Sequence, residues 1–146
     1  EAHFKDEHSE PALFGREASE QAVVEMWERQ AEYQGLHAGA ESFRNSHPAF
    51  EGRAMPGYPE PIAQIPALGE RGRYRFNYFL QKMDARLADV QYLAGDIFSV
   101  ADITAFCGLD FVQKFRLPIP PELSHVQRWY AQIQLRPSAK STAPNR

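Results

Sequence analysis

Ser99 and Asp102 lie three residues apart in the stretch GDIFSVADITAF, and a hydroxyl and a carboxylate at this spacing raise the question of catalysis. A serine at a helix N-cap accepts a hydrogen bond from the backbone N–H three residues on, and an acidic residue there reaches back to the serine N–H. Phe98 and Ile103 stand where apolar side chains close over such a start as a hydrophobic staple. The pattern therefore predicts a structural cap that starts a helix. We expect alanine at either polar position to cost ~1 kcal/mol of stability.

The other candidate ligands and nucleophiles form no known metal or catalytic motif. The five histidines have neither HxxxH nor HExxH spacing, so the sequence gives no support for a metal site. The single cysteine, Cys107, cannot form an intrachain disulfide, and its apolar surroundings predict a buried thiol rather than a nucleophile. The sequence also lacks a glycine-rich phosphate loop, so it does not indicate a nucleotide-binding enzyme.

The elements that must position these residues have a helical period. Apolar side chains recur at helical spacing over residues 19–43, 73–93 and 100–115, and a fourth such stretch starts at Ser124 and stops before Pro137. Alternation of polar and apolar residues, the pattern of a half-buried strand, is missing over any useful length. We therefore predict an all-α helix bundle of four main helices plus short ones, with residues 100–115 as its central buried helix.

The connection between the first two helices is unusually rich in helix-breaking residues. Residues 47–72 contain five prolines and four glycines, which predicts a long irregular segment. Such connections are often functional, and Phe50, Met55 or Tyr58 could lie across a site as a lid. The polar end of the chain, residues 141–146, is predicted to be a flexible tail.

Composition limits the partners of the protein. A chain of 146 residues with 43% hydrophobic residues fits one domain with its own core. A net charge of −3, without a run of Lys or Arg, gives no footprint for nucleic acid. No apolar stretch approaches the ~20 residues that span a bilayer, so we expect no membrane partner. One cysteine fits a reducing, cytoplasmic setting.

Together, four segments in this order resemble the C-terminal helical domain of cytosolic, bacterial-type glutathione transferases. They are EPALFG (residues 10–15), a long helix with a central Trp27, FSVADITAF (residues 98–106) and RWYAQIQLRPSAK (residues 128–140). In that family the capping box with its staple opens the buried central helix. The resemblance covers most of the chain, and its specificity comes from the order and spacing of the segments.

The resemblance also implies what the chain lacks. A complete family member begins with a thioredoxin-like domain, which binds glutathione and supplies the residue that activates its thiol. We interpret residues 1–18 as the end of such a domain and the linker from it, and residues 19–140 as the helical domain. The catalytic residue is therefore unknown and expected in the missing domain, and the chain alone is expected to be inactive.

A substrate-binding face follows from the resemblance as well. In the family, residues one and two turns after the tryptophan of the first helix line the electrophile pocket, which here selects Arg29, Tyr33 and His37, with Phe111 of the central helix as an apolar wall. The alternative for each is structural: Tyr33 and Phe111 as core, Arg29 and His37 as solvated surface.

The implied function is conjugation of glutathione thiolate to a small apolar electrophile by a homodimer, with glutathione as co-substrate and no other cofactor. The alternative is a non-catalytic protein-interaction module, since domains of this type are also attached to elongation-factor subunits and aminoacyl-tRNA synthetases.

Overall fold

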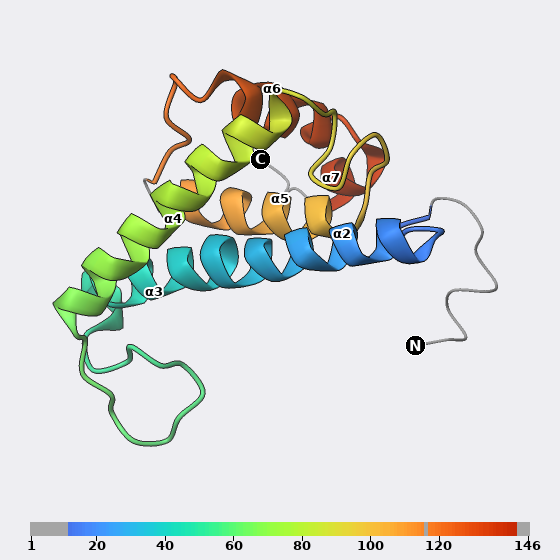
Figure 1. Ribbon diagram of the computed structural model, residues 1–146. Coiled ribbons are helices and arrows are strands. Elements are labelled where there is room, and N and C mark those ends of the chain that lie inside the picture. Colours follow the sequence, from blue (N-terminus) through green and yellow to red (C-terminus); the bar gives the residue numbers. More distant parts are fainter. Residues whose placement is uncertain (1–11, 116, 143–146) are drawn as a thin grey trace.

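Helices make up the regular structure of the computed structural model, which describes residues 12–115 and 117–142 (Figure 1). In chain order these are α2 (Ala18–Gln30), the π-helix η1 (Ala31–His37), α3 (Ala38–Arg44), the 3₁₀ turn η2 (Pro48–Phe50), α4 (Pro66–Leu87), α5 (Val100–Gln113), α6 (Ser124–Gln134) and α7 (Pro137–Thr142). Within the described ranges the extended pairings are two isolated bridges, Arg53–Ile62 and Tyr92–Gly95, and there is no strand. The predicted all-α fold is confirmed.

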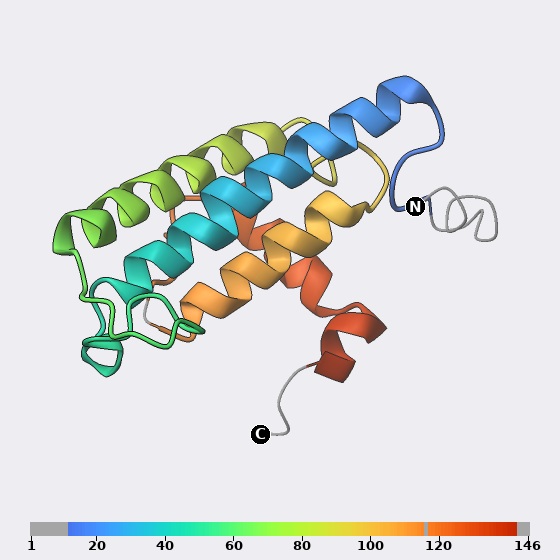
Figure 2. The same ribbon diagram turned by 90° about the horizontal axis from the view of Figure 1, so that it is seen from below.

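The first helix is a single long rod made of α2, η1 and α3. The rod lies between α4 on one side and α5 on the other, and α6 lies behind these three (Figure 2). The sequence predicted one helix over residues 19–43, and the rod matches it closely, from Ala18 to Arg44. The pattern did not predict that its middle turns are π-helical.

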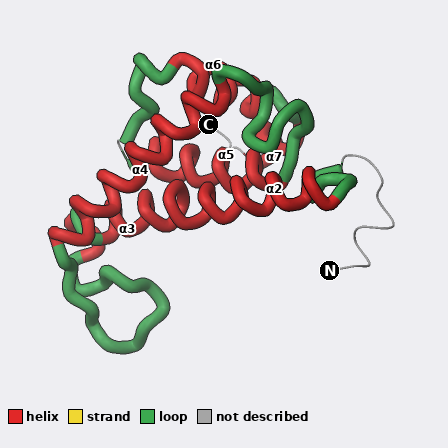
Figure 3. The backbone as a smooth tube through the Cα atoms, viewed as in Figure 1, coloured by secondary structure: helices red, strands yellow, loops and turns green. Residues whose placement is uncertain are grey.

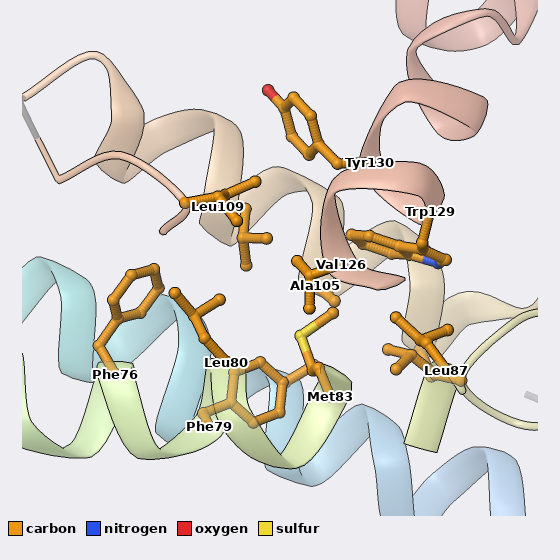
Figure 4. Close-up of a cluster of buried hydrophobic side chains, with 14 of the residues drawn as sticks. Phe76, Phe79, Leu80, Met83, Leu87, Ala105, Leu109, Val126, Trp129 and Tyr130 are labelled. Atoms are coloured by element: carbon orange, nitrogen blue, oxygen red, sulfur yellow. The ribbon is translucent and has the colours of Figure 1, made fainter. Parts of the chain in front are cut away.

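A hydrophobic core lies where α4, α5 and α6 meet (Figure 4). One face of α4 supplies much of it, because its apolar residues recur every three or four positions. The fully buried large side chains of these helices are Phe76, Phe79, Leu80, Met83, Leu87, Leu109, Val112, Val126 and Trp129. Figure 4 shows Trp129 and Tyr130 projecting from α6, on the far side of the cluster from the α4 side chains.

The second long helix begins seven residues earlier than predicted, at Pro66 instead of residue 73, and ends at Leu87 instead of residue 93. Proline fits the first turn of a helix because the N–H that it lacks would have no intrahelical partner there. The irregular connection is therefore shorter than residues 47–72. It includes η2, and its ends are joined by hydrogen bonds such as that from the Ile65 N–H to Asn45 Oδ1, at 2.9 Å.

The connection between α3 and α4 does not lie over the rod. It extends away from the helices as a loop (Figure 3), and Met55 and Tyr58 in it are exposed. Phe50 instead packs against Phe43 at the end of α3, with the ring centroids 5.1 Å apart. The structure therefore contradicts the proposed lid over the first helix.

Small residues are among those that helix α5 buries against its neighbours. Its buried positions include Ala101, Ala105 and Gly108, whereas Cys107 is exposed, so the prediction of a buried thiol was wrong. The prediction failed because it assigned every apolar residue of this helix to the core. Gly108 lets α5 approach the rod closely, since a Cβ atom there would lie 3.2 Å from the Leu36 backbone nitrogen.

The C-terminal segment is more regular than predicted. Residues 137–142 form α7, although the sequence from Ser138 onward is polar. Residues 143–146, and residues 1–11 of the predicted linker, lie outside the described residues. Among the described helices, none is long and apolar enough to cross a membrane.

Candidate functional site

The rod presents an exposed aromatic pair on its π-helical segment. Tyr33 is 55% exposed, and the side chain of His37 is 61% exposed. Their rings stack, with centroids 5.8 Å apart and an interplanar angle of 27°. The structure therefore brings together two of the residues predicted to bind substrate, and they do not belong to the core.

Arg29 joins this pair through a residue that the sequence analysis did not select. The Glu32 carboxylate lies 2.6 Å from Arg29 Nη1 through Oε2, and 3.8 Å from His37 Nε2 through Oε1. Arg29 also contacts Glu28, at 3.0 Å. Its guanidinium is therefore already paired with two carboxylates, those of Glu28 and Glu32. Glu32 was identifiable from its i, i+3 spacing to Arg29.

The opposite face of the rod packs inward. Trp27 and Ala31 are buried, and Lys82 of α4 lies over the Trp27 ring, 5.7 Å from its centroid. Because residues four apart share a face of a helix, burial of this stripe turns Arg29 and Tyr33 outward. The rod thus has an inner structural face and an outer face with polar and aromatic groups.

Phe111 does not lie in this outer face. Its ring contacts are edge-on contacts to Phe43 and Phe115, with centroid distances of 6.1 and 4.9 Å. Phe43 in turn stacks on Phe115 at 3.7 Å. These rings form an aromatic cluster between the ends of α3 and α5, and Phe111 is partly buried in it. Its predicted role as a wall of the electrophile site stays a prediction.

Ser99 and Asp102 form a capping box at the start of α5. The backbone N–H of Ser99 donates to Asp102 Oδ2 at 3.0 Å, and the Ser99 hydroxyl donates to the same oxygen at 3.1 Å. Of the predicted staple, Ile103 is 38% exposed, while the guanidinium of Arg136 lies over the ring of Phe98 at 3.6 Å. Polar bonds therefore close the helix start and Arg136 covers Phe98, while the staple contact between Phe98 and Ile103 stays a prediction.

Asp102 does more than cap a helix. Its side chain is fully buried, and its second oxygen, Oδ1, accepts hydrogen bonds from the Leu93 N–H at 3.0 Å and from Trp129 Nε1–H at 2.9 Å. Burial raises the pKa of the Asp102 carboxyl above its usual value, and the hydrogen bonds from Leu93, Trp129 and Ser99 oppose that rise. One carboxylate thus connects the start of α5, the preceding loop and α6.

Two potentially reactive groups near α5 hold their protons at neutral pH. Partial burial, with a contribution from the Asp110 carboxylate, raises the pKa of the Cys107 thiol. Burial and Asp110, which accepts a hydrogen bond from the Tyr130 hydroxyl at 3.1 Å, raise the pKa of Tyr130 to about 12. Neither group is therefore an activated nucleophile or a thiolate.

Two surface hollows of the structure lie away from the Tyr33–His37 pair. One, of about 370 Å³, is polar and lies beside the C-terminal end of α4, where Asp89, Asp96, His125 and Arg128 are among its lining residues. Another, of about 280 Å³, is enclosed by the loop from Gly52 to Pro61. Within the part of the chain that the structure describes, no group of three or more His, Cys, Asp or Glu side chains could hold a metal ion.

Comparisons with known proteins agree on one fold. Residues 70–137 match the family model described as glutathione S-transferase, C-terminal domain. The crystal structure of Gtt2 from Saccharomyces cerevisiae superposes with a TM-score of 0.83 at 28% identity, over 96% of this chain and 64% of that one. This is the fold of the glutathione transferase C-terminal domain.

Sequence relatives also support a glutathione transferase C-terminal domain. Glutathione S-transferase 2 of Saccharomyces cerevisiae is 32% identical over 130 residues, which are 89% of this chain and 53% of the relative. A glutathione S-transferase of class Gtt2 from Vibrio parahaemolyticus is 34% identical and superposes with a TM-score of 0.72, over 89% of this chain and 57% of that one. The chain thus spans about half the length of its curated relative.

The family match and the aromatic pair lie in different parts of the chain. The match begins inside α4 and includes Asp102 and Trp129, whose hydrogen bond joins α5 to α6. Tyr33 and His37 lie before the matched residues.

Proposed function

We propose that this chain is the electrophile-binding and dimer-forming domain of a cytoplasmic glutathione transferase. In this proposal a thioredoxin-like domain outside the chain holds glutathione and activates its thiol, and the helical domain receives the aromatic or apolar electrophile. The observation that carries the proposal is the exposed Tyr33–His37 stack on the rod of a glutathione transferase fold.

The chemistry of the outer face fits a planar, electron-poor electrophile. The Tyr33 ring offers an electron-rich π-face, and offset stacking of aromatic rings is favourable by about 0.5–1.5 kcal/mol beyond the area that it buries. The His37 imidazole extends the platform, and Glu32 faces it with a carboxylate. Binding energy that orients the electrophile near a thiolate lowers the barrier by bringing the reacting atoms together.

Dimer formation is supported by a second exposed aromatic pair. Tyr74 and Tyr78 lie four residues apart on α4, 72% and 57% exposed, on the side away from its buried residues. Tyrosine is enriched at protein–protein interfaces because its ring buries a large apolar area while its hydroxyl keeps a polar contact. We propose that this face of α4 meets a second copy of the chain.

The test of the proposed function is steady-state kinetics of a two-domain protein in which a thioredoxin-like domain of the family precedes this chain. With glutathione and 1-chloro-2,4-dinitrobenzene as substrates, Tyr33→Ala is expected to raise the KM for the electrophile more than the KM for glutathione. Tyr58→Ala is the matched control, because Tyr58 is similarly exposed but lies in the loop beyond α3. The chain alone is expected to give no conjugation above background.

Two results would overturn this proposal. One is conjugation by the 146-residue chain alone, since the thiol-activating group would then lie within it. The other is a folded two-domain protein without activity, or one in which Tyr33→Ala and Tyr58→Ala have the same effect. A folded but inactive protein would favour the interaction module.

A further inference from the structure

The π-helix η1 is the unusual element of the rod. Its seven residues, Ala31–His37, lie between two α-helices without a break in the rod. In a π-helix each backbone hydrogen bond joins residues five positions apart instead of four, which widens the turn. Such turns are rare in proteins, and those that occur are often at functional sites. The Tyr33–His37 stack lies within this segment.

Close contacts on both sides hold the wide turn. A Cβ atom at Gly35 would lie 2.9 Å from Phe79 Cε1 of α4, and a Cβ atom at Gly108 of α5 would lie 3.2 Å from the Leu36 backbone nitrogen. Both distances are shorter than ordinary contacts between such atoms, so each closest approach depends on a glycine. The segment is thus packed between α4 and α5 while its outer side stays exposed.

One polar bond reaches η1 from α4. Arg75 Nη2 donates to the backbone carbonyl oxygen of Tyr33 at 2.9 Å, across 42 residues of sequence. Its other guanidinium nitrogen, Nη1, lies 3.8 Å from Glu41 Oε2. Arg71, one turn earlier on α4, is also paired with Glu41, at 3.2 Å, and has no hydrogen bond to η1. The two arginines therefore differ chiefly in the contact to the Tyr33 carbonyl.

We propose that Arg75 is a positioning residue for the aromatic site. By donating to the Tyr33 carbonyl it stabilises the π turn, and the π turn places the Tyr33 and His37 rings as one platform for a planar aromatic ligand. The ligand part of this inference rests on the proposed function. The positioning part rests on the contact itself, so the two parts can fail separately.

The experiment compares Arg75→Met with Arg71→Met in the 146-residue chain. Methionine keeps much of the apolar stem and removes the donor. Aromatic ¹H–¹³C NMR spectra report the ring signals of Tyr33 and His37, and a titration reports the Kd of S-(2,4-dinitrophenyl)glutathione. We expect Arg75→Met to shift both ring signals and to raise the Kd about fivefold or more, since a hydrogen bond from a charged donor is lost. Arg71→Met should change neither.

Arg75→Lys serves as the second variant, because an ammonium group can still donate to a carbonyl oxygen. We expect it to recover at least part of both changes. Wild-type ring signals in Arg75→Met, or equal changes in Arg71→Met, would overturn the role of Arg75. A wild-type chain whose Tyr33 and His37 signals do not respond to the probe would overturn the proposed site instead, and the ring signals of the free variants would still decide the positioning role.

Discussion

At the scale of single residues, Asp102 connects more of the structure than its place in the sequence indicated. The spacing to Ser99 predicted a helix cap, and that cap is present. The bonds from Leu93 and Trp129 were not predictable from the pattern, because these donors come from a loop and from a helix 27 residues further along the chain. A carboxylate that accepts hydrogen bonds from three segments should contribute more to the free energy of unfolding than Ser99 does.

Alanine should therefore cost unequal amounts of stability at the two capping residues. Ser99→Ala should cost ~1 kcal/mol, within the usual range for a lost cap. Asp102→Ala should cost about 3–5 kcal/mol, because the N–H groups of Leu93 and Ser99 and the indole N–H of Trp129 lose their acceptor inside the protein. Urea unfolding of the two variants measures the difference. Equal losses of unfolding free energy would contradict the central role of Asp102.

The raised pKa of Asp102 gives a pH dependence with a definite sign. Because burial raises the folded-state pKa above the unfolded value of about 3.8, the folded protein binds this proton more tightly than the unfolded chain. The resulting stabilisation is fully present below the unfolded pKa and is lost as the pH rises through the folded pKa. The stability of wild type relative to Asp102→Asn should therefore fall as the pH rises above the unfolded pKa of about 3.8. A difference that grows over this range would contradict the assignment.

At the scale of elements, close approach between helices determines the shape of the bundle. A Cβ atom at Gly72 of α4 would lie 2.6 Å from the carbonyl oxygen of Ala38 and 2.7 Å from the backbone nitrogen of Ser42. Backbone atoms cannot move aside as the end of a flexible side chain can. Gly72 is therefore the position at which α4 and α3 most need the absence of a side chain.

Two glycines of the same helix provide a matched test of this packing. Gly72→Ala should destabilise the chain by about 1–3 kcal/mol through overpacking. Gly69→Ala, whose Cβ would lie 3.4 Å from Asn45, should be neutral or up to about 1 kcal/mol more stable, because alanine has the better helix propensity. Thermal unfolding of both variants measures this contrast. A Gly72→Ala variant as stable as Gly69→Ala would show that α4 and α3 lie further apart.

The element scale also shows what the sequence could predict. The long rod and the start of α5 followed from local signals: apolar periodicity, and a serine with an aspartate three residues later. The start of α6 at Ser124 was also predicted, but its cap comes from Asp84 of α4, whose Oδ1 accepts the N–H groups of His125 and Val126 at 2.9 and 3.0 Å. His125 and Val126 lie 41 and 42 residues after Asp84, so no local sequence pattern could predict this cap.

The same reasoning applies to the candidate site. Helical spacing placed Arg29, Tyr33 and His37 on one face, since residues four apart are neighbours in an α-helix or nearly so in a π-helix. It could not predict the π turn itself, because that turn depends on close contacts with α4 and α5. It also could not predict that Phe111 joins Phe43 and Phe115, because this cluster depends on how α5 lies along α3.

At the scale of the whole molecule, the exposed face of α4 predicts the oligomeric state. Replacing both Tyr74 and Tyr78 by Glu should convert a dimer into a monomer of 16.6 kDa, since charges in an apolar contact lose hydration without gaining partners. Light scattering coupled to size-exclusion chromatography measures the mass. Met55→Glu, at an exposed position of the loop, should leave the dimer intact. A wild-type monomer, or a double variant that remains dimeric, would contradict the proposed interface.

In the proposed function, the outer face of the rod is this domain's part of a site for the aromatic half of a glutathione conjugate. This role is tested most directly by an NMR titration of the 146-residue chain with S-(2,4-dinitrophenyl)glutathione, read at assigned backbone and ring signals. We expect saturable shifts that are largest at Tyr33 and His37 and at the adjoining turns of η1. Shifts centred instead on the polar hollow around His125 and Arg128, or no shift at Tyr33 and His37 up to the solubility of the conjugate, would contradict it.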